Sequence, residues 1–396
     1  MIYSAKDILC RLDDDCKKEQ SKPKFSTEDE FMDAFLWNRL DSDTLASAYK
    51  DLRLKLCEHM RLDHVIFLFG NGVSLYAGSK ETKDFKLDKY IKNSSFTGIK
   101  QDLEKISELG GIEAQLNALI TVRSYFNIVN DAGNEKIVSE LIDMIKKELI
   151  ESFVNSVDYR KLQLHKMMLL KLRVLGVLPK TQIYTTNYDL AFEYAMDSLS
   201  IEYTDGFSGF VNRQFDPRTF AEGGKPSIVK IHGSVNWVYK DSRIKEVQPE
   251  FSDGRLNVDE TAPVLIYPTS NKLHETYSTP YSELMRHMLD EMKSGSNVVV
   301  VMGYKYGDEH INEILYKALE NPRNIFYFFV FENPSSSGFI NDVSALADSM
   351  PNINILSGPA LARFDIFVKY ILPAAIELTD EEKVLVMLHR VLSKNE

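Results

Sequence analysis

The sequence predicts an α/β protein with a Rossmann-like, mainly parallel sheet and helices on both of its faces. Three observations support this class. Short β-rich runs recur along the chain, wide stretches of helical or irregular pattern separate them, and the runs at residues 64–70 and 297–303 are almost entirely apolar. Strands spaced so widely need crossover connections, and continuous apolar runs are typical of strands buried on both faces. Because such sheets bind ligands beyond the carboxyl ends of their strands, the turns there are candidate sites.

The chain divides into three predicted parts. Residues 1–62 are expected to form a charged, helical N-terminal segment, because apolar residues recur there at spacings of three and four. Residues 63–375 are expected to form the α/β domain, interrupted by a helical insertion at about 98–176. Residues 376–396 are expected to form an amphipathic C-terminal helix that begins with a capping box. The terminal helices are equally expected to form interfaces or to pack on their own domain.

Composition narrows the class of protein. The 47 basic and 58 acidic residues give a net charge of −11, which disfavours direct binding of nucleic acid or anionic membranes by the chain alone. Apolar runs are far shorter than a membrane span, and the first residues lack the apolar centre of a signal peptide, so a cytoplasmic protein is expected. The three cysteines are expected to be ordinary reduced thiols.

The first candidate turn, "GNGVS", directly follows the apolar run that ends at residue 69. Gly70 and Gly72 allow the backbone to turn sharply and approach a phosphate, whose charge the free amides at a following helix start would meet. The stretch is not the usual dinucleotide fingerprint, because Leu75 stands at the third glycine position, and it is not a P-loop. Taken alone, it is equally explained as a structural turn without a ligand.

The second candidate turn contains more polar side chains than a helix cap requires. Thr185, Thr186, Asn187 and Asp189 separate a β-rich run from a helical pattern that begins near Leu190. These side chains can hydrogen-bond a ribose, or they can cap the helix, for which one Asx residue is sufficient. The excess of hydroxyl and Asx groups favours a polar ligand.

The third candidate turn lies within residues 228–237, where an alternating apolar strand is expected to end at His232, which Gly233 and Ser234 follow. A lone histidine at a strand end is more often structural than catalytic. Its ordinary pKa of about 6.5 nevertheless makes it the side chain best suited to act as a general base near neutral pH.

The fourth candidate turn follows the apolar run at residues 297–302 and contains Gly303, Gly307, Asp308 and His310. A glycine turn in which Asp308 caps the next helix explains this pattern without a ligand. Its position at the carboxyl end of a predicted strand places it on the ligand side of the sheet.

In this order, the glycine turn, TTNYD, KIHGS and GYxxGDxHIN resemble the motifs of the sirtuin-like family of bacterial antiphage proteins, in particular the Sir2 subunits that work with a HerA-type ATPase. The similarity covers about residues 64–320. It implies that residues 63–375 form an NAD-binding catalytic domain that cleaves the bond between nicotinamide and ribose, with Asn187 and His232 as the catalytic residues. The candidate NAD-binding residues are Gly70, Asn71, Gly72, Ser74, Thr185, Thr186, Asp189, Ser234, Gly303, Tyr304, Gly307 and Asp308.

The chemistry of NAD+ fits these residue types. Nicotinamide is a cationic leaving group, so its glycosidic bond breaks with little acid assistance and leaves an oxocarbenium-like ribose. The protein must hold the ribose and admit one positioned nucleophile. We expect Asn187 to bind the ribose hydroxyls and orient water, and His232 to accept a proton. Asp189 is expected to orient the loop.

Two departures from the family pattern affect the expectation. The family turn usually reads Gly-Ala-Gly, and Asn71 stands in place of the alanine, where it would add a contact or crowd the pocket. The chain also contains no CxxC pair, so the zinc module of protein-deacylating sirtuins is not expected. NAD+ is therefore expected as substrate, without zinc.

The resemblance implies an NAD+ hydrolase that depletes cellular NAD+ in antiphage defence. It implies a hexameric HerA-type ATPase as partner and a large homo-oligomer, for which a ring of twelve is one form. Two alternatives stay open from the sequence. One is an NAD-dependent protein deacylase, and the other is a catalytically weak scaffold that senses NAD or ADP-ribose for a DNA-processing ATPase.

Overall fold

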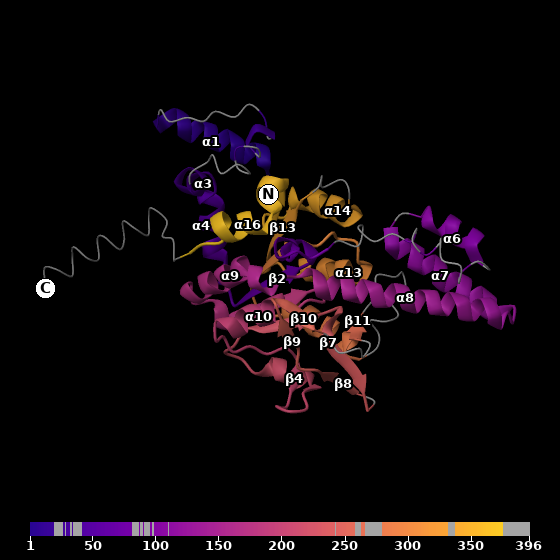
Figure 1. The fold of residues 1–396 in the computed structure, drawn as a ribbon. Coiled ribbons are helices and arrows are strands. Elements are labelled where there is room, and N and C mark those ends of the chain that lie inside the picture. The colour runs from indigo at the N-terminus through magenta and orange to yellow at the C-terminus, as the bar shows by residue number, and fades with distance from the viewer. Residues whose placement is uncertain are drawn as a thin grey trace, which may run out of the picture.

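A computed structural model gives the structure of most of the chain around one large sheet (Figure 1). The predicted C-terminal helix at residues 376–396 lies outside the described part. The structure describes residues 1–19, 27, 29–31, 34, 42–80, 87, 90, 96, 99–109, 111–241, 243–257, 263–265, 279–331 and 337–374.

The main sheet has seven strands, and every neighbouring pair is parallel. This arrangement, with helices on both faces, confirms the predicted fold class. The two strands at one edge, β1 and β14, were not predicted from the sequence. In spatial order the strands are β1 (Ile2–Ser4), β14 (Ile353–Ser357), β13 (Ile325–Val330), β12 (Asn297–Met302), β2 (His64–Phe69), β3 (Thr181–Thr185) and β6 (Ser227–Lys230).

Two hydrophobic clusters lie on the two faces of this sheet, because successive side chains of a strand point in opposite directions. In β2, Val65, Phe67 and Phe69 face the first cluster, whereas Ile66 and Leu68 face the second. The helices of the first face are α1 (Ala5–Glu19), α3 (Ser42–Ala48), α4 (Lys50–His59), α9 (Gln163–Val174), α10 (Ala191–Ser198), α15 (Pro359–Ala362) and α16 (Phe364–Ile366). Those of the second face are α12 (Tyr281–Lys293), α13 (Glu309–Leu319) and α14 (Gly338–Ala347).

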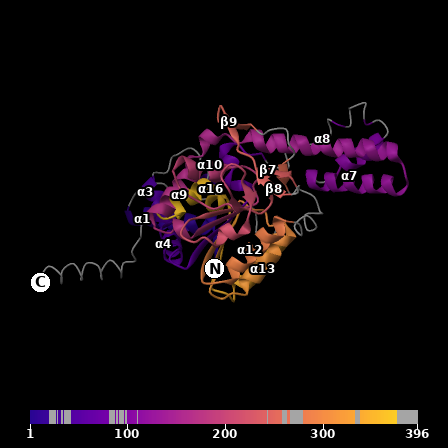
Figure 2. The same cartoon turned by 90° about the horizontal axis from the view of Figure 1, so that it is seen from below.

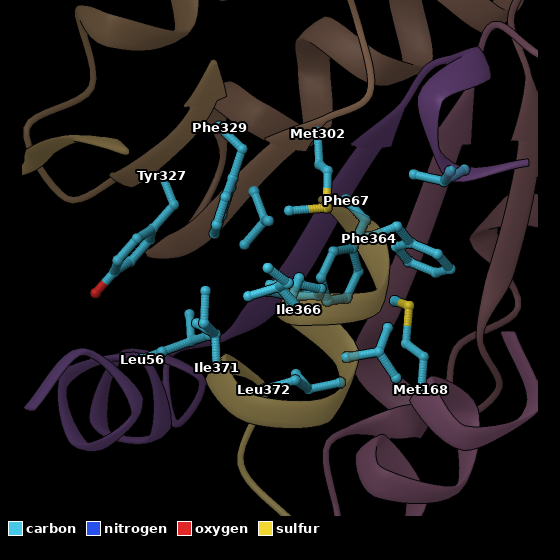
Figure 3. Packing of buried hydrophobic residues seen from close by; sticks show 14 of the residues in the cluster. Leu56, Phe67, Met168, Met302, Tyr327, Phe329, Phe364, Ile366, Ile371 and Leu372 are labelled. Atoms are coloured by element: carbon cyan, nitrogen blue, oxygen red, sulfur yellow. The ribbon is translucent and has the colours of Figure 1, made fainter. Parts of the chain in front are cut away.

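Aromatic, aliphatic and sulfur-containing side chains fill the first cluster (Figure 3). Phe67 packs edge-on against Phe367, with ring centroids 6.4 Å apart, and Met302 and Phe364 lie beside them. Full burial of each such side chain contributes about 1.5 to 3 kcal/mol. This cluster therefore fixes β2 and β12, the two strands whose ends carry the glycine turns.

Among the described residues, three helices belong to a module with its own core, which projects from the sheet domain (Figure 2). They are α6 (Lys100–Ser107), α7 (Gly111–Ile128) and α8 (Ala132–Ser156). By contrast, α9 packs on the sheet. The predicted domain boundaries, including the insertion at 98–176, stay predictions. No helix in the described ranges is both long and apolar enough to cross a bilayer.

A second, antiparallel sheet of five strands lies next to the carboxyl end of β6. The strand that the sequence placed before His232 is β6, and a turn at His232, in which Gly233 has a positive φ of 89°, separates it from the next strand. Residues 263–265, the described part of a β-rich run in the sequence, pair antiparallel with β7. The order is β11 (Pro263–Leu265), β7 (Gly233–Lys240), β8 (Arg243–Glu246), β5 (Gln214–Phe215) and β4 (Phe207–Ser208), and β9 (Glu250–Ser252) and β10 (Arg255–Asn257) form a separate hairpin.

In the described part of the chain, six short helical turns connect these elements. They are η1 (Asn71–Val73), η2 (Leu75–Ala77), η5 (Tyr159–Lys161), η6 (Leu178–Lys180), η7 (Pro217–Ala221) and the π-helical turn η9 (Phe367–Ile371).

Candidate active site

The strand register brings the four candidate turns to one edge of the sheet. Met302 pairs with Phe69, Phe69 with Thr185, and Thr185 with Lys230. The carboxyl ends of β12, β2, β3 and β6 are therefore level. The turns that follow them leave the sheet side by side, as expected for a ligand site in a parallel sheet.

Close backbone packing explains the glycines of the first and fourth turns. A Cβ on Gly70 would lie 2.4 Å from the carbonyl oxygen of Gly303, and one on Gly72 would lie 2.6 Å from the Cα of Gly303. Gly303 itself has a positive φ of 68°, a backbone conformation that residues with a side chain rarely adopt. The glycines thus let the two turns touch. Their predicted contact with NAD stays a prediction.

The first turn continues differently from the helix start that the sequence pattern indicated. Two short 3-10 turns, η1 and η2, follow Gly70. The N–H of Gly72 donates to the carbonyl of Gly303 at 3.0 Å, and the N–H of Ser74 donates to that of Asn71 at 3.0 Å. Both amides are used within the protein, because that of Gly72 joins the first turn to the fourth and that of Ser74 closes the 3-10 turn.

Asn71, the departure from the family pattern, holds the loop that follows. Its Nδ2 donates to the carbonyl oxygen of Lys80 at 2.9 Å, and its Oδ1 accepts from the hydroxyl of Ser79. The side chain of Asn71 therefore fixes residues 79 and 80 against the glycine turn.

Asn187 has a buried carboxamide that is satisfied on one side only. Its Nδ2 donates to Oγ of the fully buried Ser74 at 3.0 Å, and its backbone N–H donates to Oγ1 of Thr185 at 3.0 Å. Its Oδ1 is buried and has no hydrogen-bond partner in the protein. Leaving a buried acceptor unpaired costs about 1 to 3 kcal/mol. The arrangement is therefore suited to a ligand that donates a hydrogen bond to this oxygen.

Two other polar groups of the second turn form hydrogen bonds within the protein. The N–H of Thr186 donates to the carbonyl of Phe69 at 3.0 Å. Oδ1 of Asp189 accepts from the N–H of Ala191 at 3.0 Å, which is the structural role that the sequence left open for it.

The buried side chain of Lys230 holds the same turn in place. Nζ of Lys230 donates to the carbonyl oxygen of Asp189 and lies 3.5 Å from Oε1 of Glu193. Burial raises the pKa of Glu193, and the charge of Lys230 opposes this rise. The turn that carries Asn187 is thereby tied to the end of β6.

His232 lies in the turn between β6 and β7, and its ring contacts a second histidine. Its Nε2 is 3.0 Å from Nε2 of His310, which comes from the first turn of α13, and both residues are buried. The N–H of Ile231 donates to the carbonyl of Thr185 at 3.0 Å, so this turn is fixed to the end of β3. The sequence pattern drew attention to both histidines separately. It contained no signal for their contact, which depends on the strand order.

Ser234 points into a polar network of the second sheet. Its Oγ donates to Oδ1 of Asn236 at 2.6 Å, and Nδ2 of Asn236 donates to Oε1 of Glu246 at 2.8 Å. Arg213 bridges Glu246 to Asp205. Burial, followed by the charge of Asp205, raises the pKa of Glu246 to about 7. Ser234 thus has a structural partner, and its predicted contact with NAD stays a prediction.

The fourth turn is braced by tyrosine side chains. The hydroxyl of Tyr304 accepts from the N–H of Asp308 at 3.1 Å and lies 3.2 Å from Oδ1 of Asn312. Asp308 occupies the N-cap position of α13, but its carboxylate makes no capping hydrogen bond. Gly307 is exposed. Within the described ranges, no three His, Cys, Asp or Glu side chains are grouped so that they could hold a metal ion.

Comparison with known families finds a match over the part of the chain that carries the second, third and fourth candidate turns. Residues 181–342 match the SIR2-like domain. This segment begins at β3 and includes Asn187, His232, Gly303 and His310, whereas the glycine turn at 70–74 precedes it. No curated protein matches the chain.

Solved structures of sirtuins are similar to the chain at low identity. A crystal structure of a Sir2 homologue in complex with NAD has 14% identity and a TM-score of 0.42, and the match covers 80% of this chain and 93% of that one. A mutant Sir2 homologue bound to 2′-O-acetyl ADP-ribose has 12% identity and a TM-score of 0.37, with 80% and 95% covered. A structure on the basis of sirtuin substrate affinity has 11% identity and a TM-score of 0.37, with 80% and 96% covered.

Proposed function

We propose that this protein is an NAD+ hydrolase, which cleaves NAD+ to nicotinamide and ADP-ribose at the edge formed by β12, β2, β3 and β6. The match of residues 181–342 to the SIR2-like domain supports an activity related to NAD. The choice of hydrolysis rests on the residues of the site.

The observation that carries the proposal is the unpartnered Oδ1 of Asn187. A ribose hydroxyl would donate to this oxygen, while Ser74 holds the other end of the carboxamide. Because the carboxamide is already oriented by Ser74 and by the turn at Thr185, little ordering is required when substrate binds.

His232 is proposed as the general base. As the C1′–nicotinamide bond breaks, its electron pair leaves with neutral nicotinamide, and a water oxygen forms the new bond to C1′. The water loses one proton to the imidazole of His232. His232 is buried at the end of the strand next to β3, so the base and the ribose-binding carboxamide come from adjacent turns.

The biological setting is proposed on the resemblance of the motifs. We propose that the hydrolase acts in antiphage defence in the cytoplasm, as a homo-oligomer with a HerA-type hexameric ATPase. The proposal includes NAD+ as substrate and no zinc.

The test is release of nicotinamide and ADP-ribose from NAD+ by the purified chain, alone and with the ATPase, without any acylated peptide. The wild type should form both products in equal amounts, and His232→Ala should lower turnover by about 10²- to 10⁴-fold. Asn352→Ala is a matched control at the start of β14, where the side chain donates to the carbonyl of Asn324. It should keep wild-type turnover.

Two other results would redirect the proposal. Nicotinamide release that requires an acylated lysine peptide would indicate a protein deacylase instead. NAD+ binding without product formation, alone and with the ATPase, would indicate a sensor or scaffold.

A further inference from the structure

His310 contacts the proposed base directly, and the proposed reaction has not yet used it. The two Nε2 atoms are 3.0 Å apart, and the ring centroids are separated by 5.2 Å with an angle of 42° between the planes. In a neutral pair, one ring must carry its proton on Nε2 and the other must accept at Nε2. Each ring therefore determines the tautomer of the other.

The start of α13, which carries His310, is held firmly in place. Tyr304 fixes the backbone of Asp308, and Nδ2 of Asn312 donates to the carbonyl oxygen of Tyr306 at 2.9 Å. The hydroxyl of Tyr306 donates to the carbonyl of Phe329 on β13 at 3.1 Å. Tyr306 adopts a positive φ of 56°, which is uncommon for a residue other than glycine. Such bracing is suited to a residue whose ring must keep one orientation.

We propose that His310 is a positioning residue that orients His232, sets its tautomer and takes up the proton that His232 passes on during NAD+ cleavage. This inference rests on the proposed hydrolase function. It adds a second imidazole to the reaction. This imidazole belongs to α13, the helix that follows the turn at the end of β12.

The proton transfer balances over the two rings. In the resting pair, His232 donates Nε2–H to the Nε2 lone pair of His310, so Nδ1 of His232 is the basic nitrogen. When Nδ1 accepts the proton from the attacking water, the Nε2–H bond of His232 breaks and an N–H bond forms at Nε2 of His310. His232 ends neutral, His310 becomes an imidazolium, and that proton is released to water after the products leave.

Two substitutions separate this role from simple packing. His310→Leu removes both the hydrogen bond and the proton acceptor. His310→Gln keeps one hydrogen-bonding group towards His232 but cannot take up the proton at neutral pH. His59→Gln is the matched control, because His59 is a half-buried histidine whose Nδ1 lies 2.8 Å from the hydroxyl of Tyr327, on a helix that precedes β2.

The experiment measures kcat and KM for nicotinamide release and, separately, the Kd for NAD+ by calorimetry. We expect His310→Leu to lower kcat by about 100-fold and His310→Gln by about tenfold, within the range of general-base effects. The Kd should stay within about threefold of wild type, because His310 acts on the proton transfer rather than on binding. In a His232→Ala background, His310→Leu should cause no further loss, since the two residues act as a unit.

Four results would overturn the inference. Wild-type kcat in His310→Leu would show that the ring contact has no role in the reaction. Loss of NAD+ binding in both His310 variants, with the control unaffected, would show a structural role only. An additive loss in the double variant would show that His310 does not act through His232. Absence of nicotinamide release by the wild type would overturn the proposed function as well, so the two failures are distinguishable.

Discussion

Replacing Lys230 by methionine should destabilise the protein by about 3 to 5 kcal/mol, because the carboxylate of Glu193 is left buried without its cation. The side chain of Lys230 is 3% exposed and that of Glu193 is 12% exposed. The lysine also donates to the carbonyl oxygen of Asp189, which lies in the turn that carries Asn187. The substitution therefore removes two interactions beneath the candidate site.

The assay is thermal unfolding, monitored by circular dichroism. An unfolding entropy of about 2.1 cal/mol/K per residue amounts to about 0.8 kcal/mol/K for 396 residues. The expected loss then corresponds to a fall in Tm of about 4 to 6 °C. Removing both charges with Lys230→Met and Glu193→Leu together should recover most of this loss, since an apolar pair of similar volume is often no less stable than a buried ion pair.

Lys245→Met is the control for the loss of a lysine. Lys245 pairs with the exposed carboxylate of Asp241 at 2.6 Å, and surface pairs contribute about 1 kcal/mol or less. Its Tm should therefore fall by about 1 °C or less. A Lys230→Met protein that melts with the wild type, or a double variant less stable than Lys230→Met, would refute the reasoning.

Three further predictions concern the surroundings of the site. Gly72→Ala should lower the free energy of unfolding in urea by about 1 to 3 kcal/mol, because its Cβ would lie 2.6 Å from the Cα of Gly303; an unchanged midpoint would contradict this. Burial lowers the pKa of His165 to about 4, and both of its ring nitrogens are unpartnered. The stability that this neutral ring contributes is present above pH about 6.5 and is lost as the pH falls towards 4, so His165→Met should raise Tm more at pH 5 than at pH 8. The effect of pH on stability has the opposite sign for Glu246. Its raised pKa contributes stability that is present below pH about 4.5 and is lost as the pH rises through 7. Glu246→Gln should therefore raise Tm more at pH 8 than at pH 5. Equal shifts at the two pH values would contradict either pH prediction.

The buried central strands could be predicted because their apolar runs are unambiguous. The runs that became β2 and β12 are apolar on both faces, as a strand between two helix layers requires. Strand β14, next to the edge, contains Asn354 among its apolar residues, and the edge strand β1 has only three residues, so neither gave a comparable signal. The alternating run before His232 and the glycine after it indicated a strand end and a turn, as the structure shows, but not the antiparallel sheet that begins at Gly233.

The sequence singled out candidate site residues one by one, but it did not predict their contacts with one another. Asn187 and His232 stood out because small polar or titratable side chains follow apolar runs. The contacts of Ser74 with Asn187 and of His232 with His310 join residues 113 and 78 positions apart. They depend on the strand order and on the level ends of the strands, which a single sequence does not encode as a local pattern.

The central claim is that the buried carboxamide oxygen of Asn187 accepts a hydrogen bond from a ribose hydroxyl during NAD+ cleavage. The most direct measurement compares the rate of nicotinamide release by wild type and by Asn187→Ala, with the NAD+ affinity of both measured by calorimetry. The proposed function predicts product from the wild type and a loss of about 100-fold or more in the variant, whose fold is unchanged. A folded Asn187→Ala protein that releases nicotinamide at the wild-type rate would contradict the claim.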